Sequence, residues 1–280
     1  MLSYRHAFHA GNHADVLKHF VLIRLLRHFL QKDKPFWVID SHAGAGRYDL
    51  DHGHATRLAE YVDGIGRLWS RADLPAALAD YVELVRQFNR GGALIAYPGS
   101  PALAAALLRP GDQFRLFERH STDSALLQAN LGGDKRIHIR AGDGFAGLKA
   151  VLPPAPRRGL ILIDPSYEIR DDYSKVVAAL KDSLGRFATG TYLIWYPRLA
   201  RPEARQLPER LRRLPLQSWL DVSLDVRAPA ADGIGMQGSG LFVVNPPWTL
   251  PADLEACLPV LAAALGQDAG AGFQLDRHMP

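Results

Sequence analysis

The stretch Val38-Ile-Asp-Ser-His-Ala-Gly-Ala-Gly-Arg47 decides the fold of this 280-residue chain. An apolar run too short for a helix leads into Asp40, which predicts a buried strand that ends there. Gly44 and Gly46 then form a turn where a ligand can approach the backbone closely. Because ligands of open α/β sheets bind at the carboxyl ends of strands, we expect a ligand site here. A purely structural tight turn is the alternative, since Asp49 replaces the third glycine of the G-x-G-x-x-G dinucleotide fingerprint.

Strands and helices alternate along the rest of the chain, which predicts an α/β fold with a parallel sheet. Two extended stretches near the end, 217–226 and 240–244, lack a helix between them and predict an antiparallel hairpin at the sheet edge. The expected strands are 36–39, 113–117, 136–140, 159–163 and 191–196, and the expected helices are 14–30, 100–108, 121–130, 144–152 and 173–184.

One long insertion interrupts this alternation of strands and helices. The acid that ends the second strand, Glu118, comes 78 residues after Asp40, whereas one strand–helix unit needs about 20. The apolar pattern between these acids is helical. We therefore expect an inserted helical subdomain at residues 51–95, beside a main domain formed by residues 1–50 and 96–280.

The composition excludes several classes of protein. With 48% apolar residues and 22% charged residues, the chain is globular and not disordered. Its single cysteine excludes an intramolecular disulfide and suggests a reducing compartment. No apolar run is long enough to span a bilayer and no signal peptide is visible, so we expect a cytoplasmic protein without a membrane partner. We also expect a monomer.

Further acids follow two later strands. Glu118 can accept hydrogen bonds from both hydroxyls of a ribose, and Asp143 can accept from an adenine amine beside a Gly144 that avoids steric conflict. Each acid taken singly is more often a helix N-cap. Their position at the ends of successive strands favours a nucleotide-like cofactor.

The fourth expected strand runs into Asp164-Pro165-Ser166-Tyr167. This tetrapeptide resembles the D-P-P-Y signature of amino-group N-methyltransferases that use S-adenosylmethionine. The Asp164 carboxylate and the Pro165 carbonyl can each accept one N–H of an exocyclic amine, which turns its lone pair toward the methyl donor. Tyr167 is expected to stack on a flipped base. Ser166 replaces the second proline, which we expect to affect the rate more than the type of reaction.

A second stretch, Asn245-Pro-Pro-Trp248, matches the same pattern more closely. It comes after the last expected strand, whereas the catalytic loop should follow the fourth. We therefore assign catalysis to Asp164 and interpret Asn245–Trp248 as the exit into the final helix.

Six blocks of sequence together resemble the bacterial family of 23S ribosomal RNA adenine-N6 methyltransferases that modify adenine 2030. The resemblance covers nearly the whole chain and implies a Rossmann-like methyltransferase domain with an inserted helical subdomain. It implies S-adenosylmethionine contacts at His19, His42, Ser100, Glu118, Asp143, Gly144 and Asp164, beside the turn at Gly44, and places Tyr4, His6 and Lys18 at the target adenine. The blocks are 4–19, 41–48, 97–101, 141–145, 157–167 and 186–197.

The N-terminal block is rich in histidine, but no cysteine or acid set converges with it in the manner of a zinc site, so we expect no metal. Basic charge is concentrated elsewhere. The segment 198–213 carries a net charge of +4, equal to that of the whole chain. We expect its arginines to bind RNA phosphates, with a solvated helix face as the alternative. They are Arg198, Arg201, Arg205, Arg210, Arg212 and Arg213.

Three other functions compete with methylation of 23S ribosomal RNA. The same loop could methylate a DNA adenine, because both polymers present the same base edge. Ser166 and the arginine segment also allow an RNA-binding chaperone without catalysis. An NAD oxidoreductase is disfavoured by the incomplete glycine fingerprint and by the Asp-Pro-Ser-Tyr loop.

Overall fold

The structure is a computed structural model that describes residues 6–51 and 58–279. Its strands are β1 (Trp37–Asp40), β2 (Arg47–Asp49), β3 (Ala96–Pro98), β4 (Gln113–Glu118), β5 (Ile137–Ala141), β6 (Gly159–Ile163), β7 (Thr191–Arg198), β8 (Trp219–Asp225), β9 (Gly238–Val244) and β10 (Gly272–His278). Its helices are η1 (His6–Phe8), α1 (His13–Leu30), α3 (Gly66–Trp69), α4 (Ala76–Arg86), α5 (Ser100–Leu107), α6 (Ser121–Leu131), α7 (Gly144–Val151), α8 (Asp171–Arg186), α9 (Pro202–Arg212) and α10 (Leu250–Leu265).

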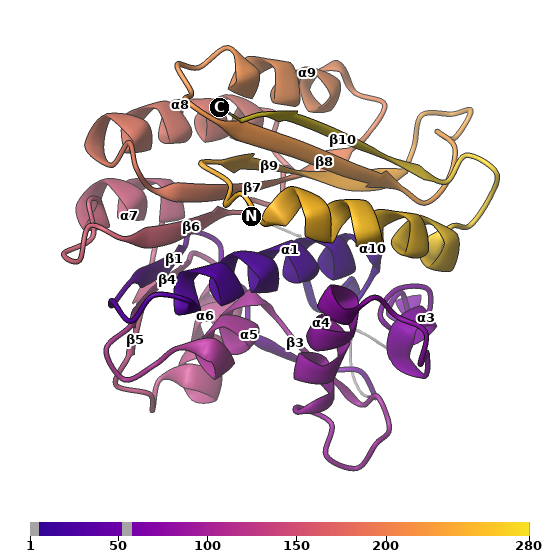
Figure 1. Cartoon of the computed structure of the whole chain (residues 1–280), viewed down its shortest axis with the longest axis horizontal. Helices are drawn as coiled ribbons and strands as arrows, with labels where there is room; N and C mark the ends of the chain where they lie inside the picture. Colours follow the sequence, from indigo (N-terminus) through magenta and orange to yellow (C-terminus); the bar gives the residue numbers. More distant parts are fainter. Residues whose placement is uncertain (1–5, 52–57, 280) are drawn as a thin grey trace.

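Within the described residues, one sheet has the strand order β10-β8-β9-β7-β6-β1-β4-β5 (Figure 1). Strands β5, β4, β1, β6 and β7 are parallel, whereas β9, β8 and β10 are antiparallel to their neighbours. The chain proceeds from β1 through β4 to β5 in one direction and from β6 to β7 in the other. The order therefore reverses between β1 and β6, which is where open α/β sheets bind ligands. The predicted parallel α/β fold is confirmed.

Helices cover both faces of the sheet. On one face α1, α4, α5 and α10 share a continuous apolar core with the sheet, and on the other face α7, α8 and α9 pack over a second apolar cluster. Asn12 caps the N-terminus of helix α1, and its side chain accepts hydrogen bonds from the backbone N–H groups of Ala14 and Asp15. This N-cap fixes the first turn of α1, where several predicted site residues lie.

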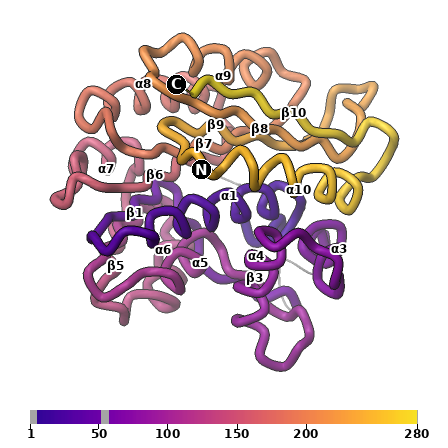
Figure 2. The backbone as a smooth tube through the Cα atoms, in the orientation of Figure 1, coloured from indigo at the N-terminus to yellow at the C-terminus, as the bar shows by residue number. Residues whose placement is uncertain are grey.

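The C-terminal end differs from the prediction. The expected hairpin exists as β8 and β9, but β10 pairs with β8 and forms the sheet edge instead. Figure 2 shows this last segment returning along β8. Most of its side chains are exposed, so the strand lacks the apolar run that the sequence argument required.

The long insertion joins β2 to β3, which pair with each other in a small separate sheet. Its helices α3 and α4 contact α10, and α4 also contacts α1. Their buried side chains, including Leu68 and Tyr81, belong to the same apolar core as α1 and the main sheet. The segment thus extends the main core beside the start of α1. No helix in the described ranges is long and apolar enough to cross a membrane.

Candidate active site

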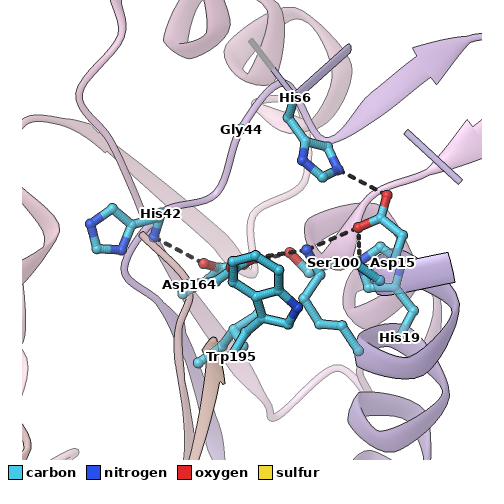
Figure 3. Close-up of polar contacts among 12 residues, drawn as sticks. His6, Asp15, His19, His42, Gly44, Ser100, Asp164 and Trp195 are labelled. Atoms are coloured by element: carbon cyan, nitrogen blue, oxygen red, sulfur yellow. Dashed lines mark hydrogen bonds and ion pairs between the residues drawn. The ribbon is translucent and has the colours of Figure 1, made fainter. Parts of the chain in front are cut away.

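A cavity of about 420 Å³ lies at the carboxyl ends of the parallel strands. The loops after β1, β4, β5 and β6, the end of β7 and the start of α1 all line it. Figure 3 shows side chains from these segments converging, among them His6, Asp15 and Asp164. Tyr4 lies outside the described residues, but the other predicted catalytic and cofactor residues line this cavity: His6, Lys18, His19, His42, Gly44, Ser100, Glu118, Asp143, Gly144, Asp164, Pro165 and Tyr167.

Glu118 is held by the glycine turn. The Gly44 N–H donates to Oε2 of Glu118 at 2.7 Å, and the His120 N–H donates to Oε1 at 2.6 Å. Gly44 has a φ of +63°, and a Cβ there would lie 2.4 Å from the Tyr48 hydroxyl, so glycine is required. Burial raises the pKa of Glu118 although both backbone bonds oppose the shift. Each oxygen keeps a lone pair with which a carboxylate can accept a ligand hydroxyl.

Asp143 caps helix α7, as the alternative interpretation proposed. Its Oδ1 accepts from the N–H groups of Phe145 and Ala146 at 2.8 and 3.1 Å. The following Gly144 is needed for a reason that the sequence did not reveal. A Cβ at Gly144 would lie 1.7 Å from the backbone oxygen of Ser41, so the steric conflict is with the chain itself. The absence of a side chain brings α7 directly against the loop after β1.

Asp40 lies beneath the cavity and does not line it. The Ser100 hydroxyl donates to Asp40 Oδ2 at 2.7 Å, and the His42 N–H donates to Oδ1 at 3.1 Å. Burial raises the pKa of Asp40 to about 6, partly offset by these two hydrogen bonds. The hydroxyl proton of Ser100 is therefore already donated within the protein. Asp40 connects α5 to the loop after β1 through these two hydrogen bonds.

Replacing Asp40 with asparagine should change the pH dependence of stability. The carboxyl group has a higher pKa in the fold than in the unfolded chain, so the stability it contributes is lost as pH rises toward 6. A pKa raised from 3.8 to about 6 corresponds to up to about 3 kcal/mol in the free energy of unfolding. As pH rises from 4.5 to 7.5, the free energy of unfolding of Asp40→Asn should increase relative to that of wild type. Urea denaturation at several pH values measures this difference. A difference that does not vary with pH would contradict the assignment.

Asp164 lies at the end of β6, beside α1. The Lys18 ammonium donates to Asp164 Oδ2 at 2.6 Å and lies 3.0 Å from Asp15 Oδ1. Burial alone would lower the pKa of Lys18, but the charges of Asp15 and Asp164 raise it well above its ordinary value. Lys18 is thus a permanent cation shared by two carboxylates. Asp15 lies within the block 4–19, but the sequence argument assigned it no role.

Tyr167 occupies a different position from the one expected. Its side chain is 2% exposed, its hydroxyl donates to the Trp195 carbonyl at 2.7 Å, and its ring packs against Tyr173. These contacts correct the expectation that the ring stacks on a base, because the ring is part of the core under the loop. Tyr167 has a φ of +53° and anchors the end of the Asp-Pro-Ser-Tyr turn. The half-buried Trp195 of β7 lines the cavity and was not predicted.

Histidines surround the cavity as neutral groups or in ion pairs. His6 Nε2 lies 2.8 Å from Asp15 Oδ2. Burial lowers the pKa of His19 to about 3 and that of His42 to about 4, so both rings are neutral near pH 7. His19 Nδ1 is hydrogen-bonded to the Tyr97 hydroxyl at 2.7 Å, whereas its buried Nε2 has no hydrogen-bond partner. Nothing in the described part of the chain groups three metal-ligating side chains.

The rival motif lies at the opposite edge of the sheet. Strand β9 is antiparallel to β7, so its last residue, Val244, pairs with Tyr192 at the start of β7. Asn245 donates from Nδ2 to the carbonyls of Ala188 and Gly190 and thereby ties two loops together. Trp248 is 79% exposed. The motif is therefore structural, as its order in the sequence predicted.

The arginine segment does not form one basic surface. Arg198 pairs with Asp225, and Arg212 pairs with Asp221, Glu209 and Asp276 while its guanidinium lies over the Trp219 ring. These two arginines are neutralised by carboxylates that the sequence could not place near them, which corrects their assignment to RNA binding. Arg201 lines the cavity, Arg205 and Arg213 are exposed, and Arg210 lies 3.4 Å from the Ser174 hydroxyl.

Comparisons with known proteins agree with this site. The family described as "Ribosomal RNA large subunit methyltransferase D, RlmJ" matches residues 33–276. The chain is 48% identical over 265 residues to "Ribosomal RNA large subunit methyltransferase J" of Escherichia coli (strain K12), covering 95% of this chain and 94% of that protein. The Haemophilus influenzae protein of the same name is 46% identical over 266 residues, with the same coverage of 95% and 94%.

A solved structure shows the same fold over nearly the full length. Protein LPL1258 from Legionella pneumophila str. Philadelphia 1 superposes with a TM-score of 0.89 at 34% sequence identity. The superposition covers 96% of this chain and 98% of that chain. The fold of this chain is therefore shared with that protein.

Proposed function

Because this chain belongs to the RlmJ family of ribosomal RNA large subunit methyltransferases, we propose that it methylates the exocyclic N6 of adenine 2030 in 23S ribosomal RNA with S-adenosylmethionine. The observation that carries the proposal is the position of Asp164, next to the acids of neighbouring strands at the topological switch point. We expect the enzyme to act as a monomer in the cytoplasm.

The residues of the cavity fit the cofactor. Glu118 retains lone pairs for ribose hydroxyls, and the second oxygen of Asp143 remains for an adenine amine. His19 lines the cavity, and its buried Nε2 has no hydrogen-bond partner within the protein, so a polar group of the cofactor could satisfy it. Bound S-adenosylmethionine would supply the methyl group from its sulfonium.

Asp164 then orients the amine of the target base. Lys18 occupies Oδ2, so Oδ1 is the oxygen assigned to accept one N–H, while the Pro165 carbonyl accepts the other. Both hydrogen bonds pull the amine out of conjugation with the ring and direct its lone pair at the methyl group. When the methyl group leaves the sulfonium, with its S–C bond broken and an N–C bond formed, Asp164 Oδ1 would take the proton that the amine loses. Trp195 supplies an aromatic surface beside this position.

Mapping of methylated adenines by mass spectrometry tests the function directly. 23S ribosomal RNA from cells lacking the protein should lose N6-methyladenine at position 2030 and regain it on complementation. Purified protein should also methylate an rRNA transcript but not a DNA duplex of the same sequence. Methylation of the DNA alone, or unchanged methylation in the deleted cells, would refute the proposal.

Within the described residues, Arg201 and Arg205 form no ion pair with a carboxylate. We therefore expect these two arginines to contact RNA phosphates. Arg201→Gln and Arg205→Gln should each weaken RNA binding a few-fold and lower the slope of log K against log salt by about 1. Arg186→Gln serves as the control, because Arg186 is exposed like Arg205 but pairs with Asp182 at the C-terminal end of α8. The measurement is a titration of labelled rRNA fragment at several salt concentrations. If neither variant changed the slope of log K against log salt, the segment 198–213 would be a solvated surface that does not bind RNA phosphates.

A further inference from the structure

Asp15 is buried at the start of α1, where its carboxylate meets His6 at the cavity (Figure 3). Its side chain is 1% exposed, with Oδ1 3.0 Å from the Lys18 ammonium and Oδ2 2.8 Å from His6 Nε2. We infer that Asp15 is a positioning residue for methyl transfer, which holds Lys18 so that Lys18 fixes the Asp164 carboxylate. This inference rests on the proposed function of Asp164.

The backbone makes Asp15 the fixed member of the group that it forms with Lys18 and His6. The Gly11 N–H donates to Asp15 Oδ2 at 2.9 Å, and the Asn12 side chain accepts from the Asp15 N–H at 3.0 Å. Asp15 is therefore held at both its backbone and its carboxylate by the turn that starts α1. Lys18, in contrast, has a long side chain with many rotamers, and needs a partner on its own helix to hold one of them. Asp15 lies three residues earlier on α1, which is the spacing at which helical side chains meet.

The charges explain why a second carboxylate is needed. A buried Lys18 that had only Asp164 as partner would place its whole charge on the group that must accept a proton. Asp15 takes part of that charge, because Lys18 lies between its Oδ1 at 3.0 Å and Asp164 Oδ2 at 2.6 Å. Held in this position, Lys18 stays on Oδ2 and leaves Oδ1 of Asp164 for the amine. Asp15 therefore acts on Asp164 through Lys18.

The test is a double-mutant cycle between Asp15→Asn and Lys18→Met. Asparagine has nearly the shape of aspartate, and with its oxygen toward Gly11 and His6 it presents an NH₂ group to the Lys18 ammonium. Asp15→Asn should lower the single-turnover rate of methyl transfer to an rRNA transcript by roughly 10- to 100-fold. The Kd of S-adenosylmethionine, measured by calorimetry, should stay within about threefold, because Asp15 acts through Lys18 and not on the cofactor.

In the Lys18→Met background the same substitution should have no further effect on the rate, because its route to Asp164 is gone. The double variant should also be more stable than Lys18→Met, which leaves Asp15 as a buried charge without its cation. This comparison remains decisive even if Asp15→Asn alone unfolds. Asp253→Asn is the matched control, since Asp253 pairs with Arg24 of α1 at 2.8 Å away from the cavity, and its rate should be that of wild type.

The inference would be overturned by a wild-type rate for Asp15→Asn, or by a further tenfold loss when it is added to Lys18→Met. A wild-type protein that transfers no methyl group to rRNA would instead refute the proposed function and the inference with it. If Asp253→Asn lost rate to the same extent as Asp15→Asn, the effect would be a general one of removing a carboxylate near α1, and the inference would also be overturned.

Discussion

Asp164→Ala should reduce methyl transfer to 23S ribosomal RNA by roughly a thousandfold while the protein still binds S-adenosylmethionine. The variant loses both the acceptor for the target amine and the group that takes its proton, and such a group contributes about 10²- to 10⁴-fold. Glu118, Asp143 and His19, which we assign to the cofactor, keep their positions on other elements. The measurement combines single-turnover kinetics with a calorimetric titration of S-adenosylmethionine.

The rival motif provides the control for this experiment. Asn245→Gly removes the polar side chain of the second Asx-Pro sequence and tolerates the φ of +52° at that position. It breaks the bonds to the Ala188 and Gly190 carbonyls and should cost stability, but the rate per folded molecule should remain that of wild type. If Asp164→Ala retained the wild-type rate while Asn245→Gly lost it, the catalytic assignment would be reversed.

Gly144→Ala should have the second largest effect. A Cβ at this position would lie 1.7 Å from the Ser41 oxygen, which is a backbone atom and cannot rotate away. Helix α7 must therefore move from the loop after β1, at an expected loss of about 3 kcal/mol in the free energy of unfolding. Asp143 caps the same helix, so the Kd of S-adenosylmethionine should rise by at least about tenfold.

Gly185→Ala is the matched control for this substitution. A Cβ at Gly185, near the end of α8, would meet nothing within 4 Å. Alanine has the higher helix propensity, so this variant should gain about 0.5 to 1 kcal/mol. Chemical denaturation and calorimetry measure both variants. Equal stability of Gly144→Ala and wild type would show that the contact between α7 and the Ser41 loop is not rigid.

The carboxyl-edge acids were predictable because their position depends only on the order of elements. Each of Asp40, Glu118, Asp143 and Asp164 follows an expected strand, and parallel strands end at one edge of a sheet. The same logic correctly placed the rival Asn245 elsewhere. The edge strand β10 was not predicted, because most of its side chains are exposed and it has no apolar run. Its position is set by pairing with β8.

What the sequence determined by itself was therefore the α/β fold, the cofactor edge and the position of Asp164 in it. Only the tertiary structure decided the partners of each charge. It showed that Arg198 and Arg212 are neutralised, that Tyr167 is buried in the core and that Asp15 holds Lys18. The physical reason is that the positions of strands and helices along the chain follow from local patterns of hydrophobicity, which the sequence displays directly. Ion pairs and burial depend on distances between residues far apart in the chain, as for Lys18 and Asp164, and those distances exist only once the chain has folded.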